Sequence, residues 1–337
     1  MVNMSCTCQT TCADPNRLNG CFYNCVGGET CICPDGFFLI GTDCVPREDC
    51  GCYVQDEEVI VQEGDDQLFL ACTKQCSCNT GVLSCNDYRC DDNAVCDNRS
   101  ESFQCFCKDG YHGDGISCTR LTDCDDVFDA GLIDDGVYSI LPMNWPGIPF
   151  QVYCKDGWTV SIKVFQRRED GSVEFNRGWA DYKEGFGDPI GEIWLGLEKL
   201  YYLTNQEHYK LKISLISDGI TYEMNYSWFK IDSEGNNYAL KELGSYSGNI
   251  GSTFFAHVGF DPMAVSHTFQ FSTPDQDNDN HPTVDCAGNF HGGWWYKQCY
   301  KIYLNGPYGS PNAPGICYLK NTIAYCNIPF TEMSIKL

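Results

Sequence analysis

Tryptophan, basic residues and long apolar runs are the clearest shortages of this 337-residue chain. All seven tryptophans lie at or beyond Trp145, so the earlier part lacks the largest core-forming side chain. Only 22 lysines and arginines accompany 46 acidic residues, a net charge of -24. Phosphate backbones require the opposite balance, so we expect no nucleic-acid partner. No apolar run reaches the ~18 residues that span a bilayer, so we expect no membrane insertion.

The motifs of hydrolytic enzymes and zinc sites are also missing. The six histidines fall in no H-E-x-x-H pattern, and no serine lies in a G-x-S-x-G sequence. We therefore expect no enzyme. C-x-x-C is absent as well, and the close cysteine pairs are all C-x-C. This spacing does not suit a zinc knuckle, so the cysteines are expected to form disulfides rather than a zinc site.

Cysteines are present in number but are unevenly distributed. Of 25 cysteines, 19 precede residue 124. The first 123 residues must therefore be held by cross-links, whereas the rest can bury a core. Disulfides at this density need an oxidising compartment, which predicts a secreted, extracellular protein. Three N-x-S sequons agree with secretion, at Asn3, Asn98 and Asn225. The start, MVNMSCTC, lacks the regions of a signal peptide, and we expect a larger multimodular chain or assembly.

Residues 1–51 carry C-x3-C, C-x-C-PDGF and C-GC elements and resemble a trypsin-inhibitor-like cysteine-rich module. The family's pairing implies the bonds Cys6–Cys25, Cys8–Cys21, Cys12–Cys50 and Cys33–Cys44. Cys31 is left over, and its family partner would lie upstream of Met1. Some members inhibit serine proteases through a loop equivalent to residues 22–24, while others are spacers. Residues 52–84 look like the short cysteine-rich segment of von Willebrand type that follows such modules, which favours the spacer.

Residues 85–119 contain the elements DNAVC, C-x-C and GYHGDG and resemble an EGF-like domain. The family's pairing implies Cys85–Cys96, Cys90–Cys105 and Cys107–Cys118. Cys52, Cys72, Cys76 and Cys78 would then pair among themselves. A rival register gives Cys85 and Cys90 to the preceding segment. Calcium-binding members carry acidic residues before the first cysteine, where this sequence has NTGVLS, so we expect a rigid spacer without calcium.

Residues 123–337 have the composition of a mixed α+β domain, with short alternating runs such as 152–154 and 158–160. The segment 192–204 predicts a helix with Ile193, Leu197, Leu200 and Tyr201 on one face. The landmarks DDGVYSI, FQRREDGSVEF, GGWWYKQCY and TEMSIKL resemble a fibrinogen-related domain. The protein is thus expected to join small disulfide-rich modules to an α+β fibrinogen C-terminal-like domain. The resemblance implies Cys124–Cys154 and Cys286–Cys299, which leaves Cys317 and Cys326, nine positions apart, for a further bond.

The run Asp275-Gln276-Asp277-Asn278-Asp279 supplies the hard oxygen ligands that calcium prefers. Alone it is the pattern of a solvated loop. Before a C-x12-C pair that contains GGWW, however, it resembles the family's calcium site. That resemblance implies the carboxylates of Asp277 and Asp279 and the backbone carbonyls of His281 and Thr283 as ligands, with Asp275 outside the first set.

In many fibrinogen-related lectins an acetyl group binds beside this calcium. Position matching implies a wall of Phe290 and Tyr300, a cis peptide at Gln298-Cys299, and a pocket mouth near Asn312 and Ala313. Acetyl-binding members often have histidine where this sequence has Tyr300, and tyrosine where it has Asn312. Asn289-Phe290 replaces the polar pair of fibrin-type peptide sites, so we expect no peptide recognition of the fibrin type. The alternative is that Phe290 and Tyr300 only pack against each other.

The predicted function is a secreted, calcium-dependent adhesion or recognition protein whose C-terminal domain binds acetylated glycans. The rival is a structural component of a matrix, mucous gel or adhesive that acts by assembly with extracellular proteins. The absence of collagen-like repeats and heptads, which trimerise many lectins of this family, favours the rival. A serine protease inhibitor is the third hypothesis.

Overall fold

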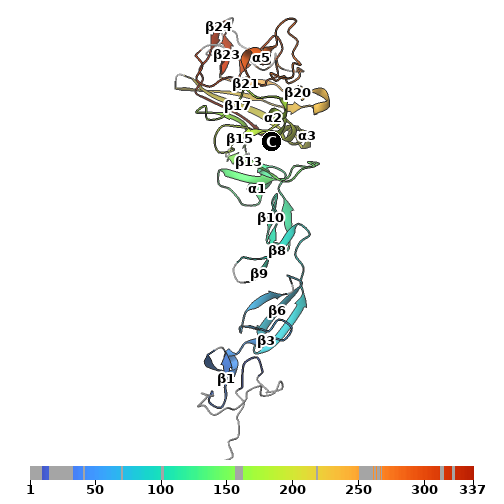
Figure 1. Cartoon of the computed structure of the whole chain (residues 1–337), viewed down its shortest axis with the longest axis vertical. Helices are drawn as coiled ribbons and strands as arrows, with labels where there is room; N and C mark the ends of the chain where they lie inside the picture. The colour runs from blue at the N-terminus through green and yellow to red at the C-terminus, as the bar shows by residue number, and fades with distance from the viewer. Residues whose placement is uncertain are drawn as a thin grey trace, which may run out of the picture. The chain divides into compact units, whose positions relative to one another are not determined.

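The computed structural model describes residues 10–14, 33–40, 42–69, 71–99, 102–155, 162–217, 219–249, 261, 263, 266, 268–311, 315–320 and 323–337. Residue contacts divide the protein into two compact units. We call residues 1–108 with 112–119 the arm, and residues 109–111 with 120–337 the head, and describe each by itself (Figure 1). Among the described residues, no helix has both the length and the apolar composition needed to cross a membrane.

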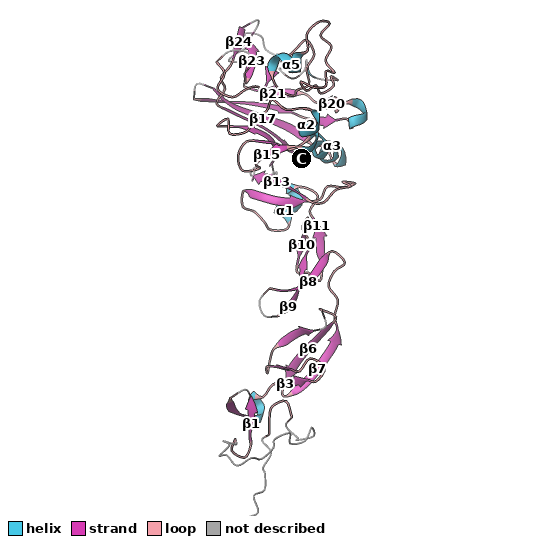
Figure 2. Cartoon of the chain, in the orientation of Figure 1, coloured by secondary structure: helices cyan, strands magenta, loops and turns pink. Residues whose placement is uncertain are grey.

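Short antiparallel strands make up the arm, as Figure 2 shows. Pairs form between β1 and β2, β3 and β4, β8 and β9, and β10 and β11, while β5, β6 and β7 form a three-stranded sheet. The bounds are β1 Phe37–Ile40, β2 Asp43–Pro46, the 3-10 helix η1 Arg47–Asp49, β3 Cys52–Val54, β4 Val59–Val61, β5 Asp66–Phe69, β6 Lys74–Asn79, β7 Val82–Asp87, β8 Ala94–Asn98, β9 Phe103–Cys107, β10 Tyr111–Gly113 and β11 Cys118–Arg120.

Disulfides replace a large apolar core in the arm. Its buried cluster contains three ordinary apolar side chains, Val54, Val61 and Phe69, beside three half-cystines. The expected bonds Cys12–Cys50, Cys33–Cys44, Cys90–Cys105 and Cys107–Cys118 are present. The pairs Cys6–Cys25 and Cys8–Cys21, the leftover Cys31, the loop 22–24 and the sequon at Asn3 lie outside the described residues.

Two expectations for the disulfides of the arm are wrong: the bond Cys85–Cys96, and the closed group of Cys52, Cys72, Cys76 and Cys78. Cys85 bonds to Cys76, and Cys96 bonds to Cys72, in place of Cys85–Cys96. The cause is the register of β6 on β7, which sets Cys76 directly opposite Cys85 with a Cα separation of 4.0 Å. Of the four cysteines expected to pair among themselves, Cys52 and Cys78 do so, while Cys72 and Cys76 each bond to a cysteine outside the group. The rival register, which gives Cys85 and Cys90 to the preceding segment, is right for Cys85, which bonds to Cys76. It is wrong for Cys90, which bonds to Cys105.

The head is built on one large antiparallel sheet in the order β12-β13-β14-β25-β17-β18-β21, with β15 and β16 attached at β14. The last strand in the sequence, β25, lies between β14 and β17 and pairs with both, so it joins the two halves of the sheet. Leu211, Ile213 and Leu215 alternate along β17 and point into the core, as a half-buried strand requires. The α+β character expected from the sequence is confirmed.

The remaining elements of the head lie around this sheet (Figures 1 and 2). Two small sheets pair β19 with β20 and β22 with β23 and β24. The bounds are α1 Cys124–Asp129, β12 Gly136–Ile140, β13 Phe150–Lys155, β14 Ile162–Arg168, α2 Trp179–Glu184, β15 Phe186–Gly187, β16 Ile193–Trp194, α3 Leu197–Gln206, β17 Lys210–Ser217, β18 Ile220–Tyr226, β19 Phe229–Ile231, the 3-10 helix η2 Glu234–Asn236, β20 Leu240–Leu243, β21 Tyr246–Gly248, α5 Cys286–Phe290, β22 Ile302–Tyr303, β23 Cys317–Lys320, β24 Ile323–Tyr325 and β25 Phe330–Lys336.

The predicted helix over 192–204 starts late, at Leu197, and runs to Gln206. Ile193 belongs to β16 instead of the apolar face of the helix. Gly196 separates the two elements, with φ at 111° and a Cβ position only 2.6 Å from the carbonyl oxygen of Glu184. Only glycine fits there, so the backbone turns at this residue before the helix begins. The expected strand at 158–160 lies outside the described residues.

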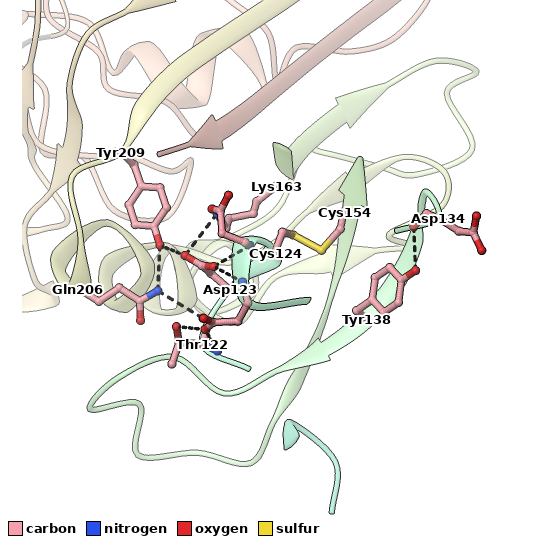
Figure 3. Close-up of a disulfide and its surroundings, with 11 residues drawn as sticks. Thr122, Asp123, Cys124, Asp134, Tyr138, Cys154, Lys163, Gln206 and Tyr209 are labelled. Carbon is pink, nitrogen blue, oxygen red and sulfur yellow. Dashed lines mark hydrogen bonds and ion pairs between the residues drawn. A yellow bond between two sulfur atoms is a disulfide. The ribbon is translucent and has the colours of Figure 1, made fainter. Parts of the chain in front are cut away.

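A buried cation ties the start of the head to its sheet (Figure 3). Lys163 of β14 is 1% exposed and donates to Asp125 at 2.8 Å, with Asp123 at 3.4 Å. Asp123 caps α1 by accepting the amides of Asp125 and Asp126, and it also accepts the hydroxyl of Tyr209. The neighbouring disulfide Cys124–Cys154 joins α1 to β13. The expected bonds Cys286–Cys299 and Cys317–Cys326 are present elsewhere in the head.

Replacing this cation should destabilise the head. Lys163→Met removes the charge opposite two carboxylates, one of them 3% exposed, and we expect a loss of about 2–3 kcal/mol. Because every tryptophan of the protein lies in the head, tryptophan fluorescence during denaturation reports on this unit alone. Lys155→Met is the matched control: the Lys155 side chain is 29% exposed where it bonds to Glu332, and Arg167 remains beside Glu332 to keep that carboxylate paired. Equal losses in the two variants would contradict the assignment.

Candidate functional site

The site begins in the loop between Ser272, which forms an isolated β-bridge with Trp294, and the start of α5 at Cys286. Side chains hold this loop from both flanks. The side-chain Nδ2 of Asn278 donates to the carbonyl of Phe271 at 2.8 Å, and its side-chain oxygen accepts from Nδ2 of Asn237 at 3.2 Å. Asp275 accepts the amide of Trp179, the first residue of α2, at 2.9 Å. The loop is therefore fixed to the body of the head on either side of Asp277.

Asp275 has a capping role. Its carboxylate also accepts the hydroxyl of Thr273 at 2.7 Å. Burial favours a higher pKa for Asp275, but the hydrogen bonds from Thr273 and the Trp179 amide outweigh it and hold the pKa below its usual value. Asp275 therefore stays charged, and its carboxylate is engaged by Thr273 and by the first amide of α2.

Three carboxylates come together at the end of the loop. Oxygen atoms of Asp277, Asp279 and Asp285 lie within 4.8 Å of one another. Asp277 and Asp279 are the expected pair, and the first accepts the amide of the second at 3.0 Å. The other two expected residues lie on the same loop: the His281 amide donates to Asp279 at 2.7 Å, and the Thr283 amide donates to Nδ1 of His281 at 3.4 Å.

Asp285 was not expected from the sequence. It is the N-cap of α5, and its side chain accepts the amide of Gly288 at 2.8 Å. An aspartate followed by a short turn of helix is a recognisable capping signal. The sequence pattern does not show that the backbone turns back between Asp279 and Asp285. This turn brings the Asp285 carboxylate beside those of Asp277 and Asp279. Hard oxygen ligands in this number and arrangement can hold a calcium ion.

The carboxylate cluster, defined as Asp277, Asp279 and Asp285, is hydrogen-bonded to the start of α5. Asp279 accepts the amide of Cys286 at 2.8 Å, beside the Asp285 cap. The Asn280 amide donates to the carbonyl of Lys297 at 3.1 Å, next to the cis peptide that joins Gln298 and Cys299. The loop of the cluster thus holds both segments that the Cys286–Cys299 bond joins.

The expected aromatic wall lies at the far end of α5. The rings of Phe290 and Tyr300 meet edge to face at a centroid distance of 4.9 Å, and Tyr303 lies 5.3 Å from Tyr300. Tyr303 donates its hydroxyl to the carbonyl of Phe290 at 3.2 Å. Tyr300 is only 9% exposed, and burial raises its pKa to about 12, so the phenol is neutral near pH 7.

The remaining expected site residues are placed as follows. Cys299 is half-buried beside the wall, while Asn312 and Ala313 lie outside the described residues. Asn98 is exposed at the end of β8. Asn225 is half-buried in β18, which is paired with β17 on one side and β21 on the other. Glycosylation at these asparagines stays a prediction.

Profiles of three protein families match the sequence. Fibrinogen beta and gamma chains, C-terminal globular domain, matches residues 120–337; EGF domain matches 84–118; and trypsin inhibitor-like cysteine-rich domain matches 1–50. The recognition of all three modules from the sequence is confirmed.

Relatives and solved structures resemble the head. Fibrinogen C domain-containing protein 1 of Xenopus tropicalis is 38% identical over 233 residues, which cover 65% of this chain and 48% of that protein. Human fibrinogen-like protein 1 is 41% identical over 205 residues, covering 57% and 62%. The chain thus spans about half to two thirds of these relatives' own length.

Among solved structures, the fibrinogen-like globe domain of human ANGPTL2 matches with a TM-score of 0.57 and 33% identity, covering 64% of this chain and 98% of that one. A lamprey fibrin D-dimer complexed with the peptide Gly-His-Arg-Pro-amide matches with a TM-score of 0.57 and 32% identity, covering 64% and 73%. With a profile match over most of its length, the protein belongs to the family defined by the C-terminal globular domain of fibrinogen beta and gamma.

Proposed function

We propose that this chain is a secreted recognition protein whose head binds acetylated glycans beside a calcium ion. The observation that carries the proposal is the position of the carboxylate cluster at the N-terminus of α5, whose last residue, Phe290, belongs to the aromatic wall. Secretion is supported by the cysteines, because each one that the structure describes is in a disulfide, as an oxidising compartment allows.

Asp277, Asp279 and Asp285 would hold the calcium ion, with the carbonyls of His281 and Thr283 completing the oxygen set. The donor chemistry fits, because carboxylates and carbonyls on a turn-rich loop are what calcium prefers. When bound, the ion supplies two positive charges that offset the mutual repulsion of three carboxylates. Asp285 adds one negative charge to the pair expected from the sequence, which favours a divalent cation further.

The carboxylates also position the ligand wall. Asp279 and Asp285 accept amides from the first turn of α5, and Asn280 holds the Lys297 carbonyl before Cys299. When the loop of the cluster is held in one arrangement by the ion, these hydrogen bonds persist. The distance between α5 and the segment around Cys299 then stays fixed. A fixed arrangement of the cluster therefore also fixes the position of Phe290, which lies four residues after Cys286 in α5.

The wall itself suits a methyl-bearing substituent. Phe290 is half-buried and keeps exposed ring surface, and Tyr300 supports it edge to face with a neutral phenol. An apolar surface with few polar anchors accepts the methyl of an acetyl group and gives little to a charged ligand. Acetylated sugars meet that requirement, and their hydroxyl groups would reach the polar loops around the wall.

A second function, assembly with extracellular proteins or peptides in a matrix or adhesive, has its own support. Tyr300 is 9% exposed and packs on Phe290, so part of the wall is filled by the protein's own rings. The similar lamprey fibrin domain was solved with a bound peptide. In this alternative the head recognises a protein surface and no sugar enters the wall.

Calcium binding tests the cluster first. We expect Asp285→Asn to weaken calcium affinity about tenfold in titration calorimetry of the full chain, since one of three charges is lost near the ion. Asparagine is as good an N-cap as aspartate, so α5 should keep its stability without calcium. Asp277→Asn should weaken affinity by a similar factor.

Asp275→Asn is the matched control for these variants, since it removes a charge of the same loop that is engaged by α2. Its calcium affinity should stay within about twofold of the wild type. If the wild-type protein takes up no calcium, or if Asp275→Asn weakens binding as much as Asp277→Asn, the assigned ligand set is wrong.

Glycan binding tests the wall. Immobilised N-acetylglucosamine and acetylated-glycan surfaces should retain the full-length protein with calcium and release it after chelation. Phe290→Ala should reduce retention at least about tenfold, because it removes the most accessible apolar contact of the wall. Ile148→Ala, at a residue 84% exposed in the loop between β12 and β13, should retain wild-type binding. A protein that binds calcium but no glycan would favour the assembly function instead.

A further inference from the structure

The junction between the von Willebrand-type segment and the EGF-like domain is crossed by two disulfides. Cys72–Cys96 and Cys76–Cys85 each join a cysteine of the first module to a cysteine of the second. In the family pairing, the cysteines of each module bond only within that module. The observed bonds therefore turn two modules into one cross-linked body.

The disulfide loops of this body overlap without a gap. Cys52–Cys78 overlaps Cys72–Cys96, which in turn overlaps Cys90–Cys105. Every backbone bond between Cys52 and Cys105 is consequently enclosed by at least one disulfide. A break in any one of these peptide bonds leaves the two sides joined through sulfur.

The family pairing would leave one gap, between Cys78 and Cys85. That gap coincides with the most accessible stretch of the sheet β5-β6-β7. All residues from Asn79 to Ser84 are exposed, and Val82 and Leu83 are 64% and 36% exposed. The stretch contains the turn that joins β6 to β7, with positive φ at Thr80 and Gly81, and the first three residues of β7. Exposed loop tips of this kind are preferred sites of proteolytic cleavage.

We propose that the arm is a tether that tolerates cleavage, in which the two junction disulfides keep the head attached after the exposed β6–β7 turn is cut. Hydrolysis of a peptide bond there consumes one water and creates a new carboxylate and a new amine. Neither product breaks a sulfur–sulfur bond. Separation requires a second reactant, a thiol that reduces Cys72–Cys96 and Cys76–Cys85. The head is therefore lost only after two different reactions, hydrolysis of the peptide bond and reduction of both disulfides.

This inference concerns the arm and holds whatever the head binds. Glu63 shows that the turn is also held in place, since its carboxylate accepts the amides of Thr80 and Gly81. A cut on the β7 side of the turn leaves β7 hydrogen-bonded to β6 and cross-linked through Cys85. The cut arm should therefore keep its fold as well as its continuity.

The test places a recognition sequence for a site-specific protease between Thr80 and Gly81 of the full-length protein. After digestion, we expect two fragments on a denaturing gel with reductant and one species without it, whose mass exceeds that of the uncut protein by one water. Tethered by its N-terminus to a surface, the cut protein should release its head only when a thiol is added.

The matched control carries the same insertion after Thr119, between Cys118 and Cys124, where no disulfide of the described residues encloses the backbone. Digestion there should free the head without reductant. Fragments that separate without reductant after the cut at Thr80 would overturn the proposal. For wild-type protein, a non-reducing peptide map decides independently of the insertion: Cys72–Cys96 with Cys76–Cys85 supports it, and Cys85–Cys96 with Cys72–Cys76 refutes it.

Discussion

Cross-linking by cysteine is the constraint on which the rest of the arm depends. Among its described residues, the buried cluster has only Val54, Val61 and Phe69 as ordinary apolar members, too little apolar surface to offset the entropy of ordering the backbone. Each disulfide lowers that entropy in the unfolded state, and overlapping loops restrict it further. The identity of the partners consequently decides the fold of the arm, in the way that side-chain packing decides the fold of the head.

The head shows the opposite balance. Trp194, Phe271 and Trp295 pack ring against ring in a core that extends over the whole sheet. Its disulfides are few and tie loops to that core instead of creating it. At the proposed site this division is plain: the rings provide a rigid base, while Cys286–Cys299 and the hydrogen bonds of Asp279 and Asp285 fix two loops above it.

Features that a motif encodes by its own spacing could be predicted from the sequence, whereas features that depend on strand register or on a reversal of the backbone could not. The modules and the head's disulfides follow from such local patterns. Cys85 was assigned to the wrong partner because strand pairing sets it opposite Cys76, which no spacing rule encodes. Asp285 was missed because its closeness to Asp279 arises from a turn of the backbone. The helix began late because Gly196 must turn there.

The Cys286–Cys299 disulfide and the carboxylate cluster meet at one element, α5. Cys286, its first residue, carries the disulfide to Cys299, and its N-cap, Asp285, carries a carboxylate of the cluster. An exposed loop site with a few carboxylates belongs to the weaker class of calcium sites, whose dissociation constants of roughly 10⁻⁴–10⁻³ M suit extracellular modules. The proposed site therefore needs the same surroundings as the arm, oxidising and outside the cell. Both requirements act through α5, because its first residue carries the disulfide and its last residue, Phe290, belongs to the aromatic wall.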